Sequence, residues 1–204
     1  MREAKALGRP REFDEDEALA AIMNVFWAKG FEGASMSDLV SATGLKKGSL
    51  YAAFGDKRAM YGKALALYDH TRIAATVERL TGDGPPFRRI DGFLQTAIGE
   101  ASRRGDGPGD PSGCFVCNAA IDQAPVDADA ERQVQASLGR METALAAVIS
   151  ELWSETEAPA STLRRQARHL MSVYFGLRVL AKAGAAPKVL KDAKDAALES
   201  FVTA

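Results

Sequence analysis

Cysteine, histidine and tryptophan are scarce in this sequence of 204 residues, which has two of each. Two cysteines, Cys114 and Cys117, cannot form the disulfide framework that stabilises many small secreted domains. A structural zinc site needs four ligands, and His70 and His169 stand at no ligand-like spacing from the cysteine pair. The sequence therefore predicts neither a metal site nor a cofactor.

Long apolar runs and an excess of charge of one sign are also missing. No segment approaches the roughly 18 apolar residues of a membrane span. The N-terminus, MREAKALGRPREFDEDEA, lacks the apolar core of a secretory signal. The net charge of −1 argues against a basic protein that coats nucleic acid or anionic membranes nonspecifically. We expect a cytoplasmic protein with no membrane partner.

Strand patterns are absent as well, because no stretch alternates between apolar and polar residues over enough positions. Apolar residues recur instead at spacings of three and four, the period of a helix that faces a core. We therefore predict an all-α fold. The predicted helices cover approximately residues 14–29, 35–43, 46–54, 56–80, 87–103, 114–123, 127–155, 161–183 and 187–201.

Two short helices separated by a glycine form the most informative part of the chain. Ser35 and Asp38 have the spacing of a capping box, and the helix that they begin ends at Gly44. A second short helix follows, from Lys46 to Phe54. This order is that of a helix-turn-helix, whose second helix enters the major groove of DNA. A helical bundle with solvated lysines is the alternative.

Lysines at both ends of the second short helix support DNA binding. Lys46 and Lys47 stand where such a helix meets base edges and phosphates, and Lys57 opens the next helix. A cation is unfavourable at a helix N-terminus until an anion such as a phosphate binds there. The predicted DNA contacts are Ser35, Lys46, Lys47, Gly48, Ser49, Tyr51 and Lys57, with Arg9 and Arg11 of an N-terminal segment that is either an arm on the DNA or an ordinary tail.

The segment TGLKKGSLYAAFGDKRAMY, residues 43–61, resembles the signature of the TetR/AcrR family of bacterial transcriptional regulators. The positions that fit the family pattern are Thr43, Gly44, Leu45, Gly48, Leu50, Tyr51, Phe54, Lys57 and Met60. Lys46 departs from the pattern, since relatives often carry a capping Ser or Thr there. The specific resemblance covers about residues 9–63, and beyond them only the length and the helical layout agree.

This resemblance implies a homodimer that reads a palindromic operator in major grooves about 34 Å apart. It implies a helix-turn-helix DNA-binding domain in residues 1–62 and a ligand-sensing and dimerisation domain in residues 63–204, joined by a long helix. The last two helices are expected to form the dimer interface through Ala167, Leu170, Met171, Tyr174, Gly176, Leu177, Ala183, Val189, Leu190, Ala193, Ala197 and Phe201. Core packing within one subunit is the alternative for these residues.

A small-molecule pocket with apolar walls and a few polar anchors is predicted among the middle helices. The candidate lining residues are Phe93, Cys114, Phe115, Asn118, Trp153, Met171, Tyr174 and Arg178, each of which also suits an ordinary core. Arg178 lies in a mostly apolar helix and is a candidate partner for a carboxylate. A surface ion pair is the alternative for it.

Cys114 and Cys117 stand three residues apart and share one predicted helix face. A thiol at a helix N-terminus has a lowered pKa, which makes Cys114 the first candidate for oxidation or electrophile modification. Lys182 is a candidate neighbouring cation if its helix packs there. The Gly-Cys pair at this place also resembles a branch of the family that senses reactive electrophiles, whereas two buried core thiols are the alternative.

The sequence thus predicts a DNA-binding transcriptional regulator, in the simplest case a homodimeric repressor. A small-molecule effector or a cysteine modification would release it from its operator. A ligand-dependent activator or corepressor-type regulator is the first alternative, and a helical adaptor without DNA function is the second. An enzyme is not predicted, because no nucleophile elbow occurs and neither histidine has a catalytic partner at a suitable spacing.

Overall fold

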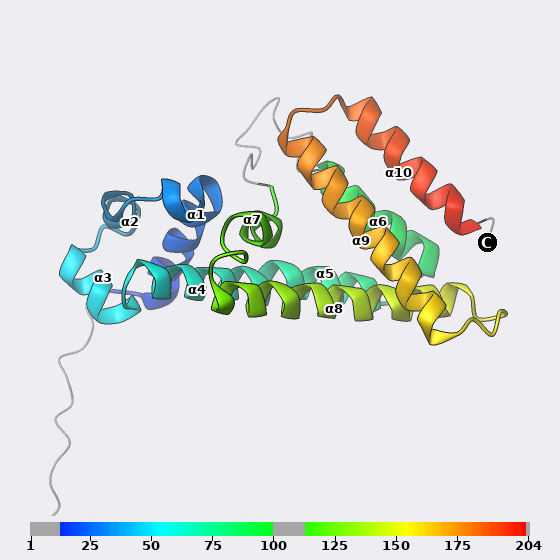
Figure 1. Ribbon diagram of the computed structural model, residues 1–204, viewed down its shortest axis with the longest axis horizontal. Coiled ribbons are helices and arrows are strands. Elements are labelled where there is room, and N and C mark those ends of the chain that lie inside the picture. Colours follow the sequence, from blue (N-terminus) through cyan, green and yellow to red (C-terminus); the bar gives the residue numbers. More distant parts are fainter. Residues whose placement is uncertain (1–12, 100–112, 203–204) are drawn as a thin grey trace, which may run out of the picture.

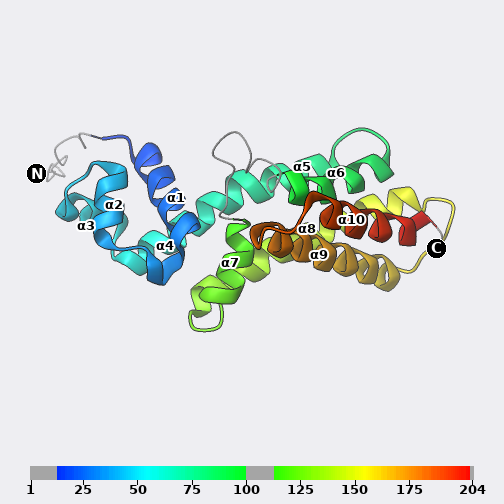
Figure 2. The same ribbon diagram turned by 90° about the horizontal axis from the view of Figure 1, so that it is seen from above.

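Residues 13–99 and 113–202 are described by the computed structural model, and every regular element in them is a helix. This confirms the predicted all-α fold. The molecule is elongated, with a group of helices at its N-terminal end joined by a long helical rod, residues 57–81, to a larger helical bundle (Figures 1 and 2). In these described stretches, no helix has the length and apolar character needed to cross a bilayer.

The N-terminal group, called the head, consists of α1 (Glu15–Gly33), α2 (Met36–Thr43), α3 (Lys47–Phe54) and the first turns of α4 (Lys57–Tyr68). The predicted capping box begins α2. The Asp38 N–H donates to Ser35 Oγ (3.1 Å), and the Ser35 N–H donates to the Asp38 carboxylate (2.8 Å). Gly44 ends α2 with a φ of 68°, a left-handed conformation that glycine adopts without strain. The helix-turn-helix therefore has the predicted order.

The first helix of the head is longer than predicted. Asp14 caps it as expected, because its carboxylate accepts the N–H groups of Asp16 (2.8 Å) and Glu17 (3.1 Å). Gly30 has the left-handed φ of 72° that a helix end requires, but the chain makes a further turn and continues to Gly33. The sequence signal at Gly30 thus marks a kink near the end of α1.

One apolar core fixes the four helices of the head to one another. Phe26 of α1, Leu39 of α2, Leu50 of α3 and Met60 of α4 are each fully buried. The ring of Tyr61 meets Phe26 edge-on, with the two centroids 5.2 Å apart. Such an edge-to-face pair adds about 0.5–1.5 kcal/mol to the stabilisation from buried area. The core therefore holds α3 in place and leaves its opposite face open to solvent.

The remaining helices form the C-terminal bundle. They are α6 (Pro86–Gly99), α7 (Phe115–Asp122), α8 (Ala128–Leu152), α9 (Ala160–Lys182) and α10 (Pro187–Val202). The long α8 runs beside the rod, α9 crosses it, and α10 covers α9 and α6 (Figures 1 and 2). The helix predicted over residues 87–103 corresponds to α6, and its predicted end at residue 103 lies outside the described residues.

The rod between head and bundle contains an irregularity that the sequence did not predict. It consists of α4, the π-helical turn η1 (Asp69–Ile73) and α5 (Ala74–Thr81), where one regular helix over residues 56–80 was expected. In this turn the Asp69 carboxylate accepts a hydrogen bond from Ser137 Oγ and pairs with Arg140, both on α8. The π-turn is therefore tied to the bundle.

Residues predicted at the dimer interface fall into two groups. Side chains buried within their own chain, at most 8% exposed, are those of Ala167, Leu170, Met171, Tyr174, Leu177, Leu190, Ala197 and Phe201. Burial within one subunit agrees with the alternative of core packing for these residues. The residues that are exposed instead are Gly176, Ala183, Val189 and Ala193.

Candidate nucleic-acid interface and ligand pocket

The third helix turns one face to the core of the head and the other to solvent. Lys46, Lys47 and Gly48 at its start are exposed, and Tyr51 is 41% exposed. The ammonium nitrogen of Lys47 lies 5.9 Å from the centroid of the Tyr51 ring, within cation–π range. Ser49 is half-buried beside them. The structure thus gathers the predicted contacts of α3 at one end of the molecule (Figure 1).

Gly48 lies inside α3, where glycine costs about 0.5–1 kcal/mol relative to alanine. A Cβ built at this position meets no atom of the chain within 4 Å. The φ angle of Gly48 is not positive either, so its backbone conformation does not require a glycine. The packing of this chain therefore gives no reason for a glycine here, whereas close approach of an external surface does.

Lys57 occupies the first turn of α4, where Asp56 is the cap and accepts the Ala59 N–H (2.8 Å). The Lys57 ammonium lies 4.5 Å from the ring centroid of Phe31 and makes no ion pair within the described residues. A cation held over an aromatic ring at a helix N-terminus remains available for an anion. This geometry suits a phosphate contact.

The remaining predicted DNA contacts differ from those on α3. The Ser35 hydroxyl donates to the Asp38 carboxylate (2.7 Å) and accepts the Asp38 N–H, so the capping box uses it fully. Its position before α2 has a structural cause that needs no DNA. Arg9 and Arg11 lie outside the described residues.

Head and bundle meet at a junction formed by three polar contacts. Trp27 Nε1 donates to the Gly113 carbonyl (2.9 Å), and the Phe31 N–H donates to the Asp122 carboxylate (3.2 Å). The third contact is an ion pair between Arg58 of α4 and Asp127, described below. Gly113 precedes α7 and Asp122 ends it, whereas Asp127 is the cap of α8, so α7 and the start of α8 share the polar connection to the head.

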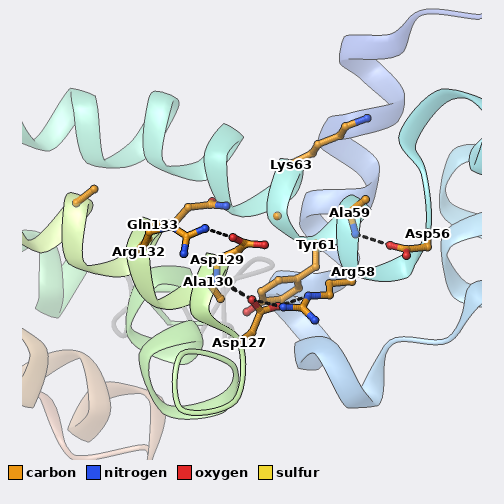
Figure 3. Close-up of a pocket in the computed structure, with 12 residues that line it drawn as sticks. Asp56, Arg58, Ala59, Tyr61, Lys63, Asp127, Asp129, Ala130, Arg132 and Gln133 are labelled. Atoms are coloured by element: carbon orange, nitrogen blue, oxygen red, sulfur yellow. Dashed lines mark hydrogen bonds and ion pairs between the residues drawn. The ribbon is translucent and has the colours of Figure 1, made fainter.

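The Arg58–Asp127 ion pair lies at a groove of about 560 Å³ between α4 and α8 (Figure 3). Arg58 Nε is 2.7 Å from one Asp127 carboxylate oxygen, and Nη2 donates to the other (2.8 Å). Asp127 also caps α8, since it accepts the N–H groups of Asp129 and Ala130. Burial raises the pKa of the Asp127 carboxyl, but the hydrogen bonds from Arg58 and the backbone lower it further, so the net shift is downward.

The residues predicted to bind a ligand do not form one site. Phe93 stacks on Tyr174 with centroids 4.3 Å apart, and Asn118 lies at a separate surface. Trp153 stacks on Phe201 (6.0 Å) at the end of α8, which as a helix of 25 residues is about 37 Å long. The prediction that Trp153 shares a pocket with Cys114 is therefore wrong, because these residues lie at opposite ends of the bundle.

A cavity of about 270 Å³, partly open to solvent, lies between α1, the rod, α6 and α9. Tyr174 and Arg178 line it as predicted, and Arg178 donates to the Tyr174 hydroxyl from Nε (3.0 Å) and Nη2 (2.6 Å). Arg72 and Arg79 also line the cavity, and neither was among the predicted ligand contacts. Their spacing of seven places them on one helix face, and this signal was readable from the sequence.

The environment of the two thiols is the opposite of the one expected. Burial raises the pKa of Cys114 to about 11, and hydrogen bonds from the α7 backbone and Tyr68 offset this only in part. The predicted lowered pKa is wrong, because loss of hydration outweighs the helix N-terminus. Burial also raises the pKa of the half-buried Cys117, although the positive charge of Lys182 opposes it. Lys182, the candidate neighbouring cation, lies near Cys117 and donates to Asn118 (2.9 Å).

The described residues contain no group of three or more His, Cys, Asp or Glu side chains that could hold a metal ion. An exposed cationic helix face can bind a polyanion, and a partly enclosed cavity lined by arginines can bind a small molecule.

Comparison with known proteins agrees with this division of the molecule. Residues 18–64, which span most of the head, match the model of the bacterial regulatory proteins of the tetR family. YezE of Bacillus subtilis (strain 168), an uncharacterized HTH-type transcriptional regulator, is 29% identical and the alignment covers 94% of this chain and 98% of YezE. The HTH-type transcriptional repressor ComR of Escherichia coli (strain K12) is 28% identical, and the alignment covers 89% of this chain and 85% of ComR.

Solved structures extend the similarity to the whole fold. A cysteine mutant of the TetR family transcriptional regulator CifR, complexed with 26-bp double-strand operator DNA, aligns with a TM-score of 0.78. It is 30% identical, and the alignment covers 94% of this chain and 98% of that one. The chain therefore belongs to the TetR family of transcriptional regulators, and it is a DNA-binding regulator rather than an enzyme.

Proposed function

We propose that the protein is a homodimeric repressor that reads a palindromic operator through α3 and dissociates from it when a small molecule binds in the C-terminal bundle. The observation that carries the proposal is the exposed face of α3, where Lys46, Lys47 and Tyr51 surround a glycine that the chain's own packing does not require. The similarity to a regulator bound to operator DNA supports the same reading of this face.

Residues 1–62 would form the DNA-binding domain and residues 63–204 the sensing and dimerisation domain. Lys46, Lys47, Ser49 and Tyr51 would contact the major groove and its phosphates, with Gly48 allowing close approach. Lys57 would bind a flanking phosphate, because its ammonium and the α4 N-terminus favour the same anion. These roles follow from exposure, charge and position on the helix-turn-helix.

The dimer would form through exposed apolar faces of α9 and α10. Gly176, Val179, Leu180 and Ala183 recur at spacings of three, four and seven on α9, and Val179 and Leu180 are 48% and 42% exposed. Val189 of α10 is 50% exposed. Small and apolar residues in one such stripe allow two helices to pack closely, which makes this face the best candidate for contact with a second copy.

Release would follow from the junction around α7. A ligand that binds one arrangement of the bundle more tightly than the other shifts the protein towards that arrangement. Because Gly113, Asp122 and Asp127 connect α7 and its flanks to α1 and α4, a displacement of this region changes the placement of the head. The coupling is reciprocal, so operator DNA should weaken effector binding by the same factor.

Any thiol-based release would use Cys117 first. Cys114 is buried with its pKa raised to about 11, whereas Cys117 is half-buried and feels the positive charge of Lys182. If the Cys117→Ser variant is still released from operator DNA by hypochlorite, then the Cys117 thiol is not the sensor. Cys114→Ser is the matched variant.

The repressor proposal is tested by selecting bound sites from random duplex DNA and measuring operator affinity by fluorescence anisotropy at several salt concentrations. Lys47→Ala removes one phosphate contact from each protomer of the dimer, so it should weaken binding and reduce the slope of log K against log salt by about 2. Tyr51→Ala should weaken binding as well. Arg132→Ala, which removes a 72% exposed arginine of α8 outside the proposed DNA and dimer faces, is the control and should behave as the wild type.

Equal affinity of wild type, Lys47→Ala and Tyr51→Ala for the selected DNA would contradict the proposed reading face. Complete failure to retain any duplex at low ionic strength would contradict DNA binding itself. A reporter gene placed behind the selected site then shows the sign of regulation, and higher expression in cells that contain the protein would contradict repression.

A further inference from the structure

The cavity between α1, the rod, α6 and α9 is lined by three arginines. Arg72 comes from the π-turn, Arg79 from α5 and Arg178 from α9. The described lining contains no aspartate or glutamate. Arg178 is 7% exposed, and burial lowers the pKa of its guanidinium while the nearby Arg79 lowers it further. Positive charge is therefore concentrated in a partly enclosed space.

Two of these arginines make no ion pair within the described residues. The Arg72 guanidinium lies over the ring of Trp27 at 5.9 Å, and Arg79 donates to Thr76 Oγ1 (3.2 Å). Other arginines of the C-terminal bundle, such as Arg89 and Arg168, have carboxylate partners. Arginine forks match the geometry of carboxylates, so two forks without such a partner at one cavity indicate an external anion.

The rest of the lining specifies what such an anion carries. Trp27, Tyr68 and Tyr174 supply aromatic walls, and Thr71, Thr76 and Thr96 add hydroxyl groups. An apolar cavity of about 150 Å³ holds a benzene molecule, so about 270 Å³ holds a six-membered ring with one short acidic substituent.

We propose that this cavity is the effector site and that it binds a small organic carboxylate with a flat apolar body, its acid group held by Arg72, Arg79 and Arg178. The proposal rests on the proposed function and adds the chemical class of the effector. The apolar body would lie against Trp27 and Tyr174.

The position of the cavity explains how such a ligand would reach the head. Trp27 belongs to α1, and its indole N–H donates to Gly113, the residue before Cys114. Its ring meets Tyr68 of α4 edge-on, with centroids 5.0 Å apart. One wall of the cavity is thus part of the head itself. A ligand that draws Arg72 away from the Trp27 ring would act directly on α1, without a relay through distant helices.

The experiment uses the full-length protein and reads the fluorescence of Trp27. Trp153→Phe provides the background, because Trp153 is the second tryptophan and lies at the far end of α8. The probes are benzoate, phenylacetate and cinnamate, each compared with its uncharged amide. At least one carboxylate should give saturable quenching with a Kd at least tenfold below that of its amide, and calorimetry should give the same ratio.

Arg79→Gln should weaken carboxylate binding at least tenfold and leave amide binding unchanged. Arg72→Gln is the second variant, and both side chains are exposed enough for the fold to tolerate the change. Arg88→Gln is the matched control, since Arg88 is exposed on α6 and does not line the cavity. Circular dichroism melts confirm that the variants are folded.

The proposal would be overturned if the amides bound as tightly as their carboxylates. It would also be overturned if Arg79→Gln and Arg72→Gln left carboxylate binding unchanged, or if none of the three acids bound. Operator affinity measured on the same samples distinguishes failure of the proposed effector class from failure of the proposed function. Operator binding without carboxylate selectivity would refute the effector class and leave the regulator intact. Selective carboxylate binding by a protein that retains no DNA would refute the proposed function and leave the cavity's chemistry intact.

Discussion

The ring of Phe115 is the apolar contact through which α7 reaches the rod, and its removal tests the packing of the junction. Phe115 is 1% exposed, and its centroid lies 5.4 Å from that of Tyr61 and 5.7 Å from that of Tyr68, edge-on to both. Truncating a buried phenylalanine to alanine costs about 3–5 kcal/mol, because apolar contact is lost and a cavity remains. We expect Phe115→Ala to lower the free energy of unfolding by this amount.

Phe115→Leu distinguishes the stability due to the buried side-chain volume from that due to the edge-on ring contacts. Leucine restores most of the apolar volume but neither edge-on contact, and each contact contributes about 0.5–1.5 kcal/mol. We therefore expect a loss of about 1–3 kcal/mol for this variant. Ile121→Ala is the matched control on the same helix. Ile121 is 71% exposed, so its truncation should change the free energy of unfolding by less than about 0.5 kcal/mol.

Urea unfolding followed by far-ultraviolet circular dichroism gives the free energy of unfolding from the midpoint and the slope of the transition. A loss of less than about 1 kcal/mol for Phe115→Ala at unchanged slope would refute the packing described for the junction. Two separate transitions in the wild type would refute the cooperative connection between head and bundle.

Gly48→Ala should raise the free energy of unfolding by about 0.5–1 kcal/mol, because its Cβ meets no atom within 4 Å, and should weaken operator binding. At pH 8, Ellman's reagent should react with Cys117 before Cys114, since burial raises the pKa of Cys114 to about 11 and leaves about 0.1% of it as thiolate. Hydrogen bonds, led by that from Lys29, lower the pKa of the Asp38 carboxyl. Its contribution to stability is thus complete above the ordinary value of 3.8 and is lost as the pH falls, so Asp38→Asn should flatten the acid limb of the stability curve.

Clear outcomes contradict each of these predictions. Unchanged operator affinity of Gly48→Ala at higher stability would show that DNA does not approach the α3 backbone. Equal modification rates of the two thiols, compared in Cys114→Ser and Cys117→Ser, would contradict the burial of Cys114. A wild-type stability curve that parallels that of Asp38→Asn down to pH 2 would show that the Asp38 contacts do not form in solution.

The parts of the fold governed by local rules were predictable from the sequence. Ser35 and Asp38 form the predicted capping box, and Gly44 ends α2 in the left-handed conformation that only glycine adopts easily. The turn chemistry of residues 35–55 leaves few alternatives, because each cap or glycine satisfies backbone groups that no other nearby residue can reach. The order of the helix-turn-helix followed directly from these signals.

Features set by tertiary packing were not predictable in the same way. The π-turn at Asp69 depends on contacts with Ser137 and Arg140, which are distant in sequence. The pKa of Cys114 was predicted in the wrong direction, because a helix terminus is visible in the sequence whereas complete burial is not. The distant position of Trp153 has the same origin, since helix lengths alone do not show which ends of a bundle meet.

The three polar ties between head and bundle restrict how the head can move. Two of them start from α1, at Trp27 and Phe31, and one starts from α4, at Arg58. A body fastened at points on two different helices cannot swivel about either helix axis while every fastening stays intact. The head should therefore travel together with α7 and the first turn of α8 as one block, because Asp127 caps α8, and the movement between the operator-bound and released forms should occur beyond this block, in the rest of the C-terminal bundle.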